Sequence, residues 1–255
     1  MCNWNLKNKK AVVTGGTKGI GKAIVQEFLE LGAEVLFTAR NSEESKLLQK
    51  EWQEKGWEAS ALPGDVNDRK HQMELRTWIK DHWNGTLDIL VNNAGVNLRK
   101  PTAEYTADEY QYVLDTNLTA PFELTRTLFP FLQKRKGAGI INIASVAGSF
   151  DAGTGAPYGM SKAALIQLTK NLAKEWAHLG IRVNCVSPWF TQTPLTKDLL
   201  ANQEKTAAII SRTPMRRVAR PEEVAAAVAF MAMDKAAYIT GQNISVDGGA
   251  TINIL

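Results

Sequence analysis

The sequence has few of the features that mark secreted, membrane-embedded or metal-binding proteins. It holds two cysteines in 255 residues, which is too few for a disulfide framework or a cysteine-rich metal site. Its most apolar run, Val224 to Met233, is too short to cross a bilayer, and the first ten residues lack the apolar centre of a signal peptide. We therefore expect a cytoplasmic protein that has no metal ion and does not enter a membrane.

The chain also has little net charge, no low-complexity tract, no fixed repeat and no linker-like stretch. Its 30 Lys and Arg residues against 26 Asp and Glu give a net charge of +4, and the basic residues fall in separate short clusters. A nucleic-acid-binding protein usually gathers such residues into a stripe. With 44% hydrophobic residues the chain can bury a full core. We expect one globular domain over residues 1–255, with a small molecule rather than nucleic acid as its partner.

Short apolar runs alternate with amphipathic helical segments along the whole chain. The runs predict strands at 11–14, 34–38, 58–62, 89–91, 139–144, 182–186 and 243–246. The segments between them predict helices at 19–31, 43–55, 69–83, 107–132, 158–179 and 222–233. This order is typical of an α/β fold with a Rossmann-type, doubly wound parallel sheet of about seven strands and helices on both faces. The long connection after the sixth strand, with a helix at 195–211, predicts a substrate lid at about 189–215.

A glycine-rich turn, Thr-Gly-Gly-Thr-Lys-Gly-Ile-Gly at residues 14–21, joins the first strand to the first helix. Glycines allow the backbone to approach a pyrophosphate, which then lies at the positive end of the helix. The turn predicts a dinucleotide site whose contacts include Gly15, Thr17, Lys18, Gly19 and Ile20. It lacks the Gly-Lys-Ser/Thr ending of a P-loop, and a purely structural turn is the alternative.

The end of the second strand indicates which dinucleotide is preferred. An Asp or Glu at this point usually binds the ribose 2′-hydroxyl of NAD, whereas a 2′-phosphate needs a cation. Here Ala39 provides no carboxylate, while Arg40 and Lys18 provide two positive charges suited to phosphate. The sequence therefore predicts NADP(H), the alternative being that both bases are simply exposed surface residues.

Four polar residues are candidates for catalysis. Tyr158 and Lys162 lie one helical turn apart on the same face of a predicted helix. Ser145 directly follows an apolar strand, so it is expected at the carboxyl edge of the sheet, where such folds bind ligands. Asn117 is a polar residue inside a helical stretch, and Asn-Asn-Ala-Gly at 92–95 ends the fourth strand.

These motifs resemble the short-chain dehydrogenase/reductase family over essentially the whole chain. The matching positions are the turn at 14–21, Asp65, residues 92–95, Asn117, Ser145, Tyr158, Lys162 and Val-Asp-Gly-Gly at 246–249. Within the family, segments 104–106 and 238–242 are most similar to the tropinone reductases and their bacterial relatives. The resemblance implies an NADP(H)-dependent carbonyl reductase or alcohol dehydrogenase that transfers hydride between nicotinamide and a small ketone or secondary alcohol. It also implies a homotetramer or homodimer.

The resemblance assigns a role to each candidate catalytic residue. Ser145 and Tyr158 would hydrogen-bond the substrate oxygen as negative charge develops on it, and Tyr158 would be the general acid or base. Lys162, together with the nicotinamide charge, would lower the pKa of Tyr158 and would also bind the nicotinamide ribose. Asn117 would position a water that relays the proton.

The resemblance also implies the remaining cofactor contacts. Asp65 and Val66 would bind the adenine edge, Asn92, Ala94 and Gly95 the adenosine ribose side, and Pro188, Thr191 and Thr193 the nicotinamide end. A helix cap is the alternative role for Asp65. Trp189 stands where the family usually has glycine, so the backbone path and the substrate geometry stay open at that point.

The expected substrate pocket is largely apolar. Its lining would comprise Val146, Phe150, Trp189 and Phe190, with Leu195 as a further candidate. Asn97, Arg99 and Lys100 at its edge would suit an anionic carrier, so reduction of a 3-oxoacyl thioester on an acyl carrier protein is an alternative. A protein that binds NADP as a redox sensor without turnover is the non-enzyme alternative. Loss of one of the four catalytic residues would favour the sensor, and all four are present.

Overall fold

A seven-stranded parallel sheet forms the centre of the computed structural model, which describes residues 4–253. The strands are β1 (Lys10–Thr14), β2 (Glu34–Thr38), β3 (Ala59–Ala61), β4 (Ile89–Asn92), β5 (Gly139–Ile143), β6 (Arg182–Pro188) and β7 (Asn243–Val246). Their order in the sheet is β3-β2-β1-β4-β5-β6-β7, and every neighbouring pair is parallel. The chain order reverses between β1 and β4, which confirms the expected doubly wound α/β fold.

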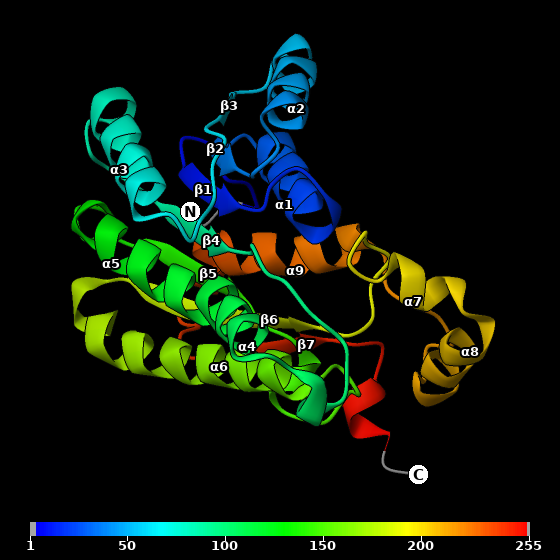
Figure 1. Cartoon of the computed structure of the whole chain (residues 1–255). Coiled ribbons are helices and arrows are strands. Elements are labelled where there is room, and N and C mark those ends of the chain that lie inside the picture. Colours follow the sequence, from blue (N-terminus) through cyan, green and yellow to red (C-terminus); the bar gives the residue numbers. More distant parts are fainter. Residues whose placement is uncertain (1–3, 254–255) are drawn as a thin grey trace.

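Helices cover both faces of the sheet (Figure 1). One face packs against α1 (Gly19–Glu30), α2 (Ser42–Glu54) and α9 (Pro221–Ala232), and the other against α3 (Arg69–Trp83), α5 (Ala120–Leu132) and α6 (Ala156–Trp176). Successive residues of β1 point to opposite faces, so Val13 joins the first core cluster and Val12 joins the second. Both faces are therefore buried, which explains the nearly continuous apolar strands.

The expectation of one continuous α-helix at 107–132 is wrong for the middle of that range. The chain forms α4 (Ala107–Leu114), a π-helical segment (Asp115–Thr119) and then α5. Asn117 lies in the π segment and is fully buried. Its Oδ1 accepts a hydrogen bond from the Val96 amide at 2.8 Å, and its Nδ2 donates to the Val96 carbonyl at 2.9 Å. These bonds stabilise the wider turn, and π segments of this kind are frequent at functional sites.

The expected lid helix at 195–211 is two helices, α7 (Lys197–Ala201) and α8 (Gln203–Arg212), which project from the body of the protein (Figure 1). Asn202 separates them because its backbone is extended and its side chain caps α8 by accepting from the Lys205 amide at 2.9 Å. The segment returns to the body through a bridge between Thr191 and Ala219.

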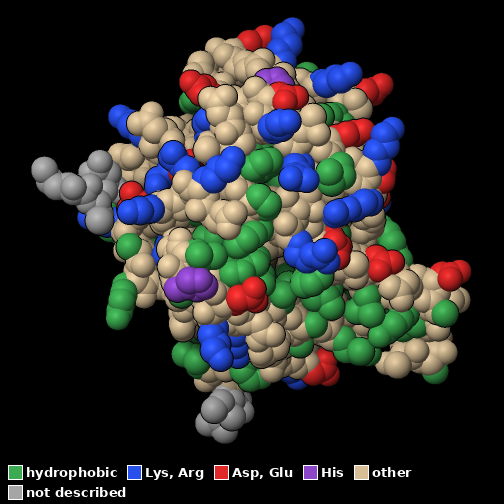
Figure 2. Space-filling model, turned by 90° about the vertical axis from the view of Figure 1, so that its left-hand side faces the viewer, with side chains coloured by type: hydrophobic (Ala, Val, Ile, Leu, Met, Phe, Trp, Pro, Cys, Tyr) green, Lys and Arg blue, Asp and Glu red, His purple; other side chains and the backbone are tan. Residues whose placement is uncertain are grey.

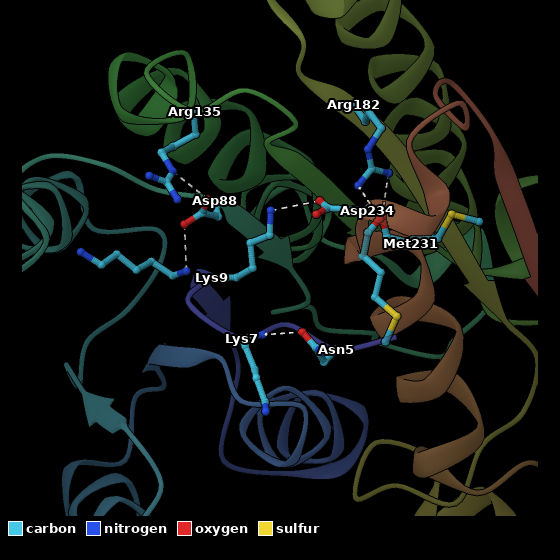
Figure 3. Close-up of polar contacts among 10 residues, drawn as sticks. Asn5, Lys7, Lys9, Asp88, Arg135, Arg182, Met231 and Asp234 are labelled. Carbon is cyan, nitrogen blue, oxygen red and sulfur yellow. Dashed lines mark hydrogen bonds and ion pairs between the residues drawn. The ribbon is translucent and has the colours of Figure 1, made fainter. Parts of the chain in front are cut away.

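Polar contacts stabilise the end of the sheet where the strands begin (Figure 3). Asp88 accepts a hydrogen bond from Arg135 Nε at 2.8 Å, and Lys9 pairs with Asp234 at 3.0 Å. Arg182 is buried and donates to two backbone carbonyl oxygens at the end of α9. A cation there satisfies the helix end and its partial negative charge. These bases stabilise the fold at the edge away from the candidate site.

The surface agrees with the charge pattern of the sequence. On the face drawn in Figure 2, Lys and Arg side chains are mixed with Asp and Glu rather than gathered into one stripe. Among residues 4–253, no helix is long and apolar enough to cross a membrane.

Candidate active site

A cavity of about 560 Å³ opens at the carboxyl ends of the central strands, where doubly wound sheets bind their ligands. It is formed by the segments that follow β1 to β6. Its walls bring together most of the residues selected from the sequence: Gly15, Thr17, Lys18, Gly19, Ile20, Arg40, Asp65, Val66, Ala94, Gly95, Ser145, Tyr158, Lys162, Pro188, Trp189, Phe190, Thr191 and Thr193.

Asn92 does not line this cavity, contrary to expectation. It is buried, and its Nδ2 donates to Thr125 Oγ1 at 3.1 Å and to Asn142 Oδ1 at 2.8 Å, which ties β4 to its neighbours. The next residue, Asn93, lines the cavity instead and donates to the Thr14 carbonyl at 2.8 Å. Strand alternation explains the exchange, because two consecutive residues point to opposite sides.

Val146 and Phe150, which were expected in the substrate pocket, are not part of this cavity wall. Val146 is buried in the short 3₁₀ turn after Ser145, and the side chain of Phe150 is 56% exposed outside the cavity. Trp189 and Phe190 do line it, in an edge-to-face arrangement with ring centroids 4.6 Å apart. The sequence missed Ala152 and Thr154, which contribute to the wall from the loop before α6.

Trp189 fits its position without backbone strain, because it is not among the described residues that have a positive φ. Its backbone amide donates to the Val246 carbonyl at 3.1 Å, and its indole Nε1 donates to Thr213 Oγ1 at 3.1 Å. The large side chain that replaces the family's usual glycine therefore joins β6 to the far end of α8.

The glycine turn has the geometry of an anion cradle. Gly15 and Gly19 have φ values of +69° and +51°, a region that favours glycine. A Cβ on Gly21 would lie 2.1 Å from the Gly15 carbonyl oxygen, so this close approach requires glycine. No side chain caps the start of α1, which leaves the first helical amides for a ligand at the positive helix end.

The adjoining part of the cavity carries the two expected cations and one carboxylate that was not expected from the sequence. Arg40 donates to the Tyr112 hydroxyl at 3.2 Å, and Lys18 Nζ lies 3.3 Å from Glu44 Oε2. Glu44 lines the same cavity from the first turn of α2. The available signal was the pair Glu43 and Glu44 at the start of the predicted helix 43–55, but acidic residues are also ordinary in a first helical turn.

Ser145 and Tyr158 meet at the other end of the cavity, where the segment after β5 faces the start of α6. Burial raises the pKa of Tyr158, while the hydrogen bond with Ser145 and the positive charge of Arg99 act in the opposite direction. The net direction of the pKa is upward because burial of the phenol outweighs these neighbours. The lowering that the resemblance implies also needs the charge of the nicotinamide. The two hydroxyl-bearing side chains therefore lie together in the wall of one cavity.

Lys162 is buried one turn further along α6. Its Nζ donates to the Ile143 carbonyl at 2.8 Å and lies 5.7 Å from the centre of the Tyr158 ring. Burial lowers the pKa of Lys162 to about 8, with Cys185 acting in the opposite direction. An ammonium with so depressed a pKa is poised to gain or lose a proton near neutral pH.

Asn117 lies beside this group but outside the cavity wall. A Cβ on Gly95 would lie 3.2 Å from Asn117 Oδ1 and 3.5 Å from Lys162 Nζ, so the three residues meet at one point. Both ends of the Asn117 amide bind Val96, and its Nδ2 also donates to Ser161 Oγ at 3.1 Å. Its side chain thus holds the segment after β4 against α6.

Comparison with known proteins agrees with this geometry. A family model described as enoyl-(acyl carrier protein) reductase matches residues 15–251. A tropinone reductase homolog of Arabidopsis thaliana is 44% identical over 250 residues, which cover 98% of this chain and 95% of the relative. The chain belongs to the short-chain dehydrogenase/reductase family.

Solved members of the short-chain dehydrogenase/reductase family share the whole fold. A gluconate 5-dehydrogenase from Burkholderia cenocepacia, in complex with NADP and tartrate, superposes with a TM-score of 0.94 at 29% identity and covers 98% of both chains. An NADP complex of RhlG from Pseudomonas aeruginosa gives a TM-score of 0.91 at 34% identity, covering 98% of this chain and 99% of that one. The dehydrogenases and reductases among these relatives identify the chain as an oxidoreductase that acts on CH–OH or C=O groups.

Proposed function

We propose that the protein is an NADP(H)-dependent carbonyl reductase or alcohol dehydrogenase for a small ketone or secondary alcohol, similar to the tropinone reductases. The observation that carries the proposal is one continuous cavity with the glycine cradle at one end and Ser145, Tyr158 and Lys162 at the other. Residues 1–255 would form one catalytic domain, with the lid at about 189–215.

The cavity fits a phosphorylated dinucleotide. The uncapped start of α1 suits a pyrophosphate, and Arg40 with Lys18 provides the positive charge that a 2′-phosphate needs. Asp65 and Val66 would bind the adenine edge, and Thr191 and Thr193 the nicotinamide end. NADP complexes of two solved relatives support this assignment.

The nicotinamide would supply or accept the hydride, and this chain's own residues would control the substrate oxygen. Ser145 and Tyr158 donate hydrogen bonds to the carbonyl oxygen, which stabilises the negative charge that develops there. Tyr158 then gives its phenolic proton to that oxygen, or removes it in the oxidation direction. A protonated Lys162 holds the ribose and favours the phenolate electrostatically, while Asn117 acts as a positioning residue through Val96.

Assembly and location are part of the same proposal. We propose a homotetramer or homodimer, which would cover the exposed side chains of Tyr110, Phe122 and Met160 on α4, α5 and α6. We propose the cytoplasm as its location, since the buried free thiol of Cys185 suits a reducing compartment.

Two variants test the catalytic proposal. NADPH consumption is measured over a panel of ketones for the wild type and for Tyr158→Phe, which removes only the phenolic oxygen. We expect the variant to bind NADPH like the wild type and to lose at least 100-fold in kcat, a typical contribution of general acid catalysis. A wild type that never oxidises NADPH would make the redox sensor the better account. For the cofactor, Arg40→Ala should lower the preference for NADPH over NADH, and an unchanged ratio would contradict the 2′-phosphate assignment.

A further inference from the structure

The charges that line the cavity are divided between its two ends. The carboxylates in its wall are Glu44 and Asp65, which follow β2 and β3 at the end assigned to the adenosine half of the cofactor. Around Ser145 and Tyr158 the lining contains no carboxylate. It contains Arg99, from the segment that follows β4, in addition to the buried Lys162.

Arg99 has no acidic partner within residues 4–253. Its Nη1 donates one hydrogen bond, to the backbone carbonyl of Leu195 at 3.2 Å, and the residue is exposed. The next residue, Lys100, forms an ion pair with Glu109 on α4 and so is already neutralised. A guanidinium has five N–H donors, so most of those of Arg99 are free to bind a further group.

The charge of Arg99 reaches the reacting end of the cavity. It acts on Tyr158 across the cavity, in the direction that favours the phenolate. The cavity wall also includes the aromatic side chains of Trp189 and Phe190 and the neutral polar side chain of Thr154. For a ligand whose oxygen lies between Ser145 and Tyr158, Arg99 is therefore the exposed positive charge that can bind an anionic second group.

We propose that the substrate is a small oxo acid, or the corresponding hydroxy acid, whose carboxylate is bound by Arg99 while its carbonyl oxygen lies between Tyr158 and Ser145. This inference rests on the proposed function. In reduction, hydride adds to the carbonyl carbon, the Tyr158 proton goes to the oxygen, and the products are the hydroxy acid and NADP⁺. The carboxylate is unchanged, and it serves to orient the molecule.

The same guanidinium joins substrate binding to the lid. Leu195 lies at the start of the lid, just before α7, and Arg99 holds its carbonyl oxygen. The planar fork can bind a carboxylate through two of its N–H groups and keep the bond to Leu195 through a third. An acid bound at Arg99 would therefore stabilise the lid over the apolar wall, which a neutral ketone does not do.

The test compares acids with their neutral methyl esters. Acetoacetate, 4-oxopentanoate and 5-oxohexanoate and the three esters are reduced with NADPH by the wild type, Arg99→Ala and Arg99→Lys. Arg76→Ala is the matched control, because Arg76 is an exposed base on α3 outside both the cavity wall and the lid. The three acids place the carboxylate at increasing distances from the carbonyl, so the preferred acid reports the spacing between Tyr158 and Arg99.

We expect the wild type to prefer at least one acid over its ester by 10-fold or more in kcat/KM. Arg99→Ala should lower kcat/KM for that acid by roughly 10- to 100-fold, the range of a charge-assisted hydrogen bond, and should change the ester less than 3-fold. Arg99→Lys should recover part of the loss, and Arg76→Ala should match the wild type. Higher salt should reduce the preference for the acid, because the site is open to solvent.

Three results would overturn the inference. Equal use of acids and esters, or an equal loss on both in Arg99→Ala, would show that no carboxylate is recognised there. Reduction of acetoacetyl-coenzyme A but of none of the free acids would favour an acyl thioester substrate instead. If the wild type reduces neither acids, esters nor any neutral ketone, the proposed function itself fails, and this outcome differs from the first two because they leave ketone reduction intact.

Discussion

The buried ammonium of Lys162 should make the protein less stable near neutral pH than it would be with an apolar residue at this position. Its pKa is lowered to about 8 because burial penalises the charged form, whereas an unfolded lysine titrates near its usual value of 10.5. Below about pH 8 the folded protein must keep a charge in a buried position. The cost is fully present there, and it falls as the pH rises from about 8 towards 10.5, where the unfolded state binds more protons than the folded state.

The size of this effect follows from the two pKa values. The fall of the Lys162 pKa from 10.5 to about 8 corresponds to between about 3 and 4 kcal/mol of unfolding free energy. Substitution Lys162→Met removes this cost, and it also removes the hydrogen bond to the Ile143 carbonyl, which is worth about 1 kcal/mol. The lost hydrogen bond does not depend on pH. The unfolding free energy of the wild type should therefore rise by about 2 kcal/mol relative to that of Lys162→Met between about pH 7 and about pH 9.5.

The assay is urea unfolding of the wild type and Lys162→Met at both pH values, followed by far-ultraviolet circular dichroism. Lys170→Met is the control, since Lys170 lies on the same helix and is exposed. We expect the unfolding free energies of Lys170→Met and the wild type to differ by the same amount at both pH values. A pH-independent difference for Lys162→Met, or a shift of the opposite sign, would refute the claim that the ammonium is buried at a cost.

Three further changes test other parts of the site. Glu44→Gln frees Lys18 from an exposed ion pair and should raise the ratio of NADPH affinity to NADH affinity about 2- to 5-fold in a fluorescence titration. A lower ratio would contradict the assignment of Lys18 to the 2′-phosphate. Asn117→Leu leaves buried backbone groups unpaired and should lower the unfolding free energy by about 3 kcal/mol in urea, and an unchanged midpoint would disprove its positioning role. Trp189→Phe keeps the apolar wall but loses the bond to Thr213, so KM for the ketone should rise about 5-fold with unchanged NADPH affinity. An equal rise in the NADPH dissociation constant would place Trp189 at the cofactor instead.

The fold could be predicted almost completely because its signals are local. Each buried strand is a short apolar run, and each helix has one apolar face, so the order of the elements follows directly from the sequence. The π segment at Asp115–Thr119 was missed because nothing in its composition separates it from an α-helix. It depends on bonds from Asn117 to Val96, which are 21 positions apart.

The site could be predicted in part, for a related reason. Ser145, Tyr158 and Lys162 lie at strand ends or on one helix face, so their meeting follows from the topology. Asn92 was misplaced because the exchange with Asn93 depends on where β4 ends, and strand ends are hard to locate to one residue. Phe150 was misplaced because the path of the loop after β5 is set by tertiary packing. The partners of Arg99 and Glu44 could not be predicted at all, because they come from distant elements.

The central claim is that this chain transfers hydride between a nicotinamide and a carbonyl carbon with Tyr158 as the proton donor. The most direct measurement is a single turnover of NADPH that carries deuterium at both C4 positions with a small oxo acid or ketone, followed by mass spectrometry of the alcohol. We expect deuterium on the carbinol carbon with the wild type, and almost no labelled alcohol with a Tyr158→Phe variant that still binds NADPH. Unlabelled alcohol from the wild type, or equal labelling by the variant, would contradict it.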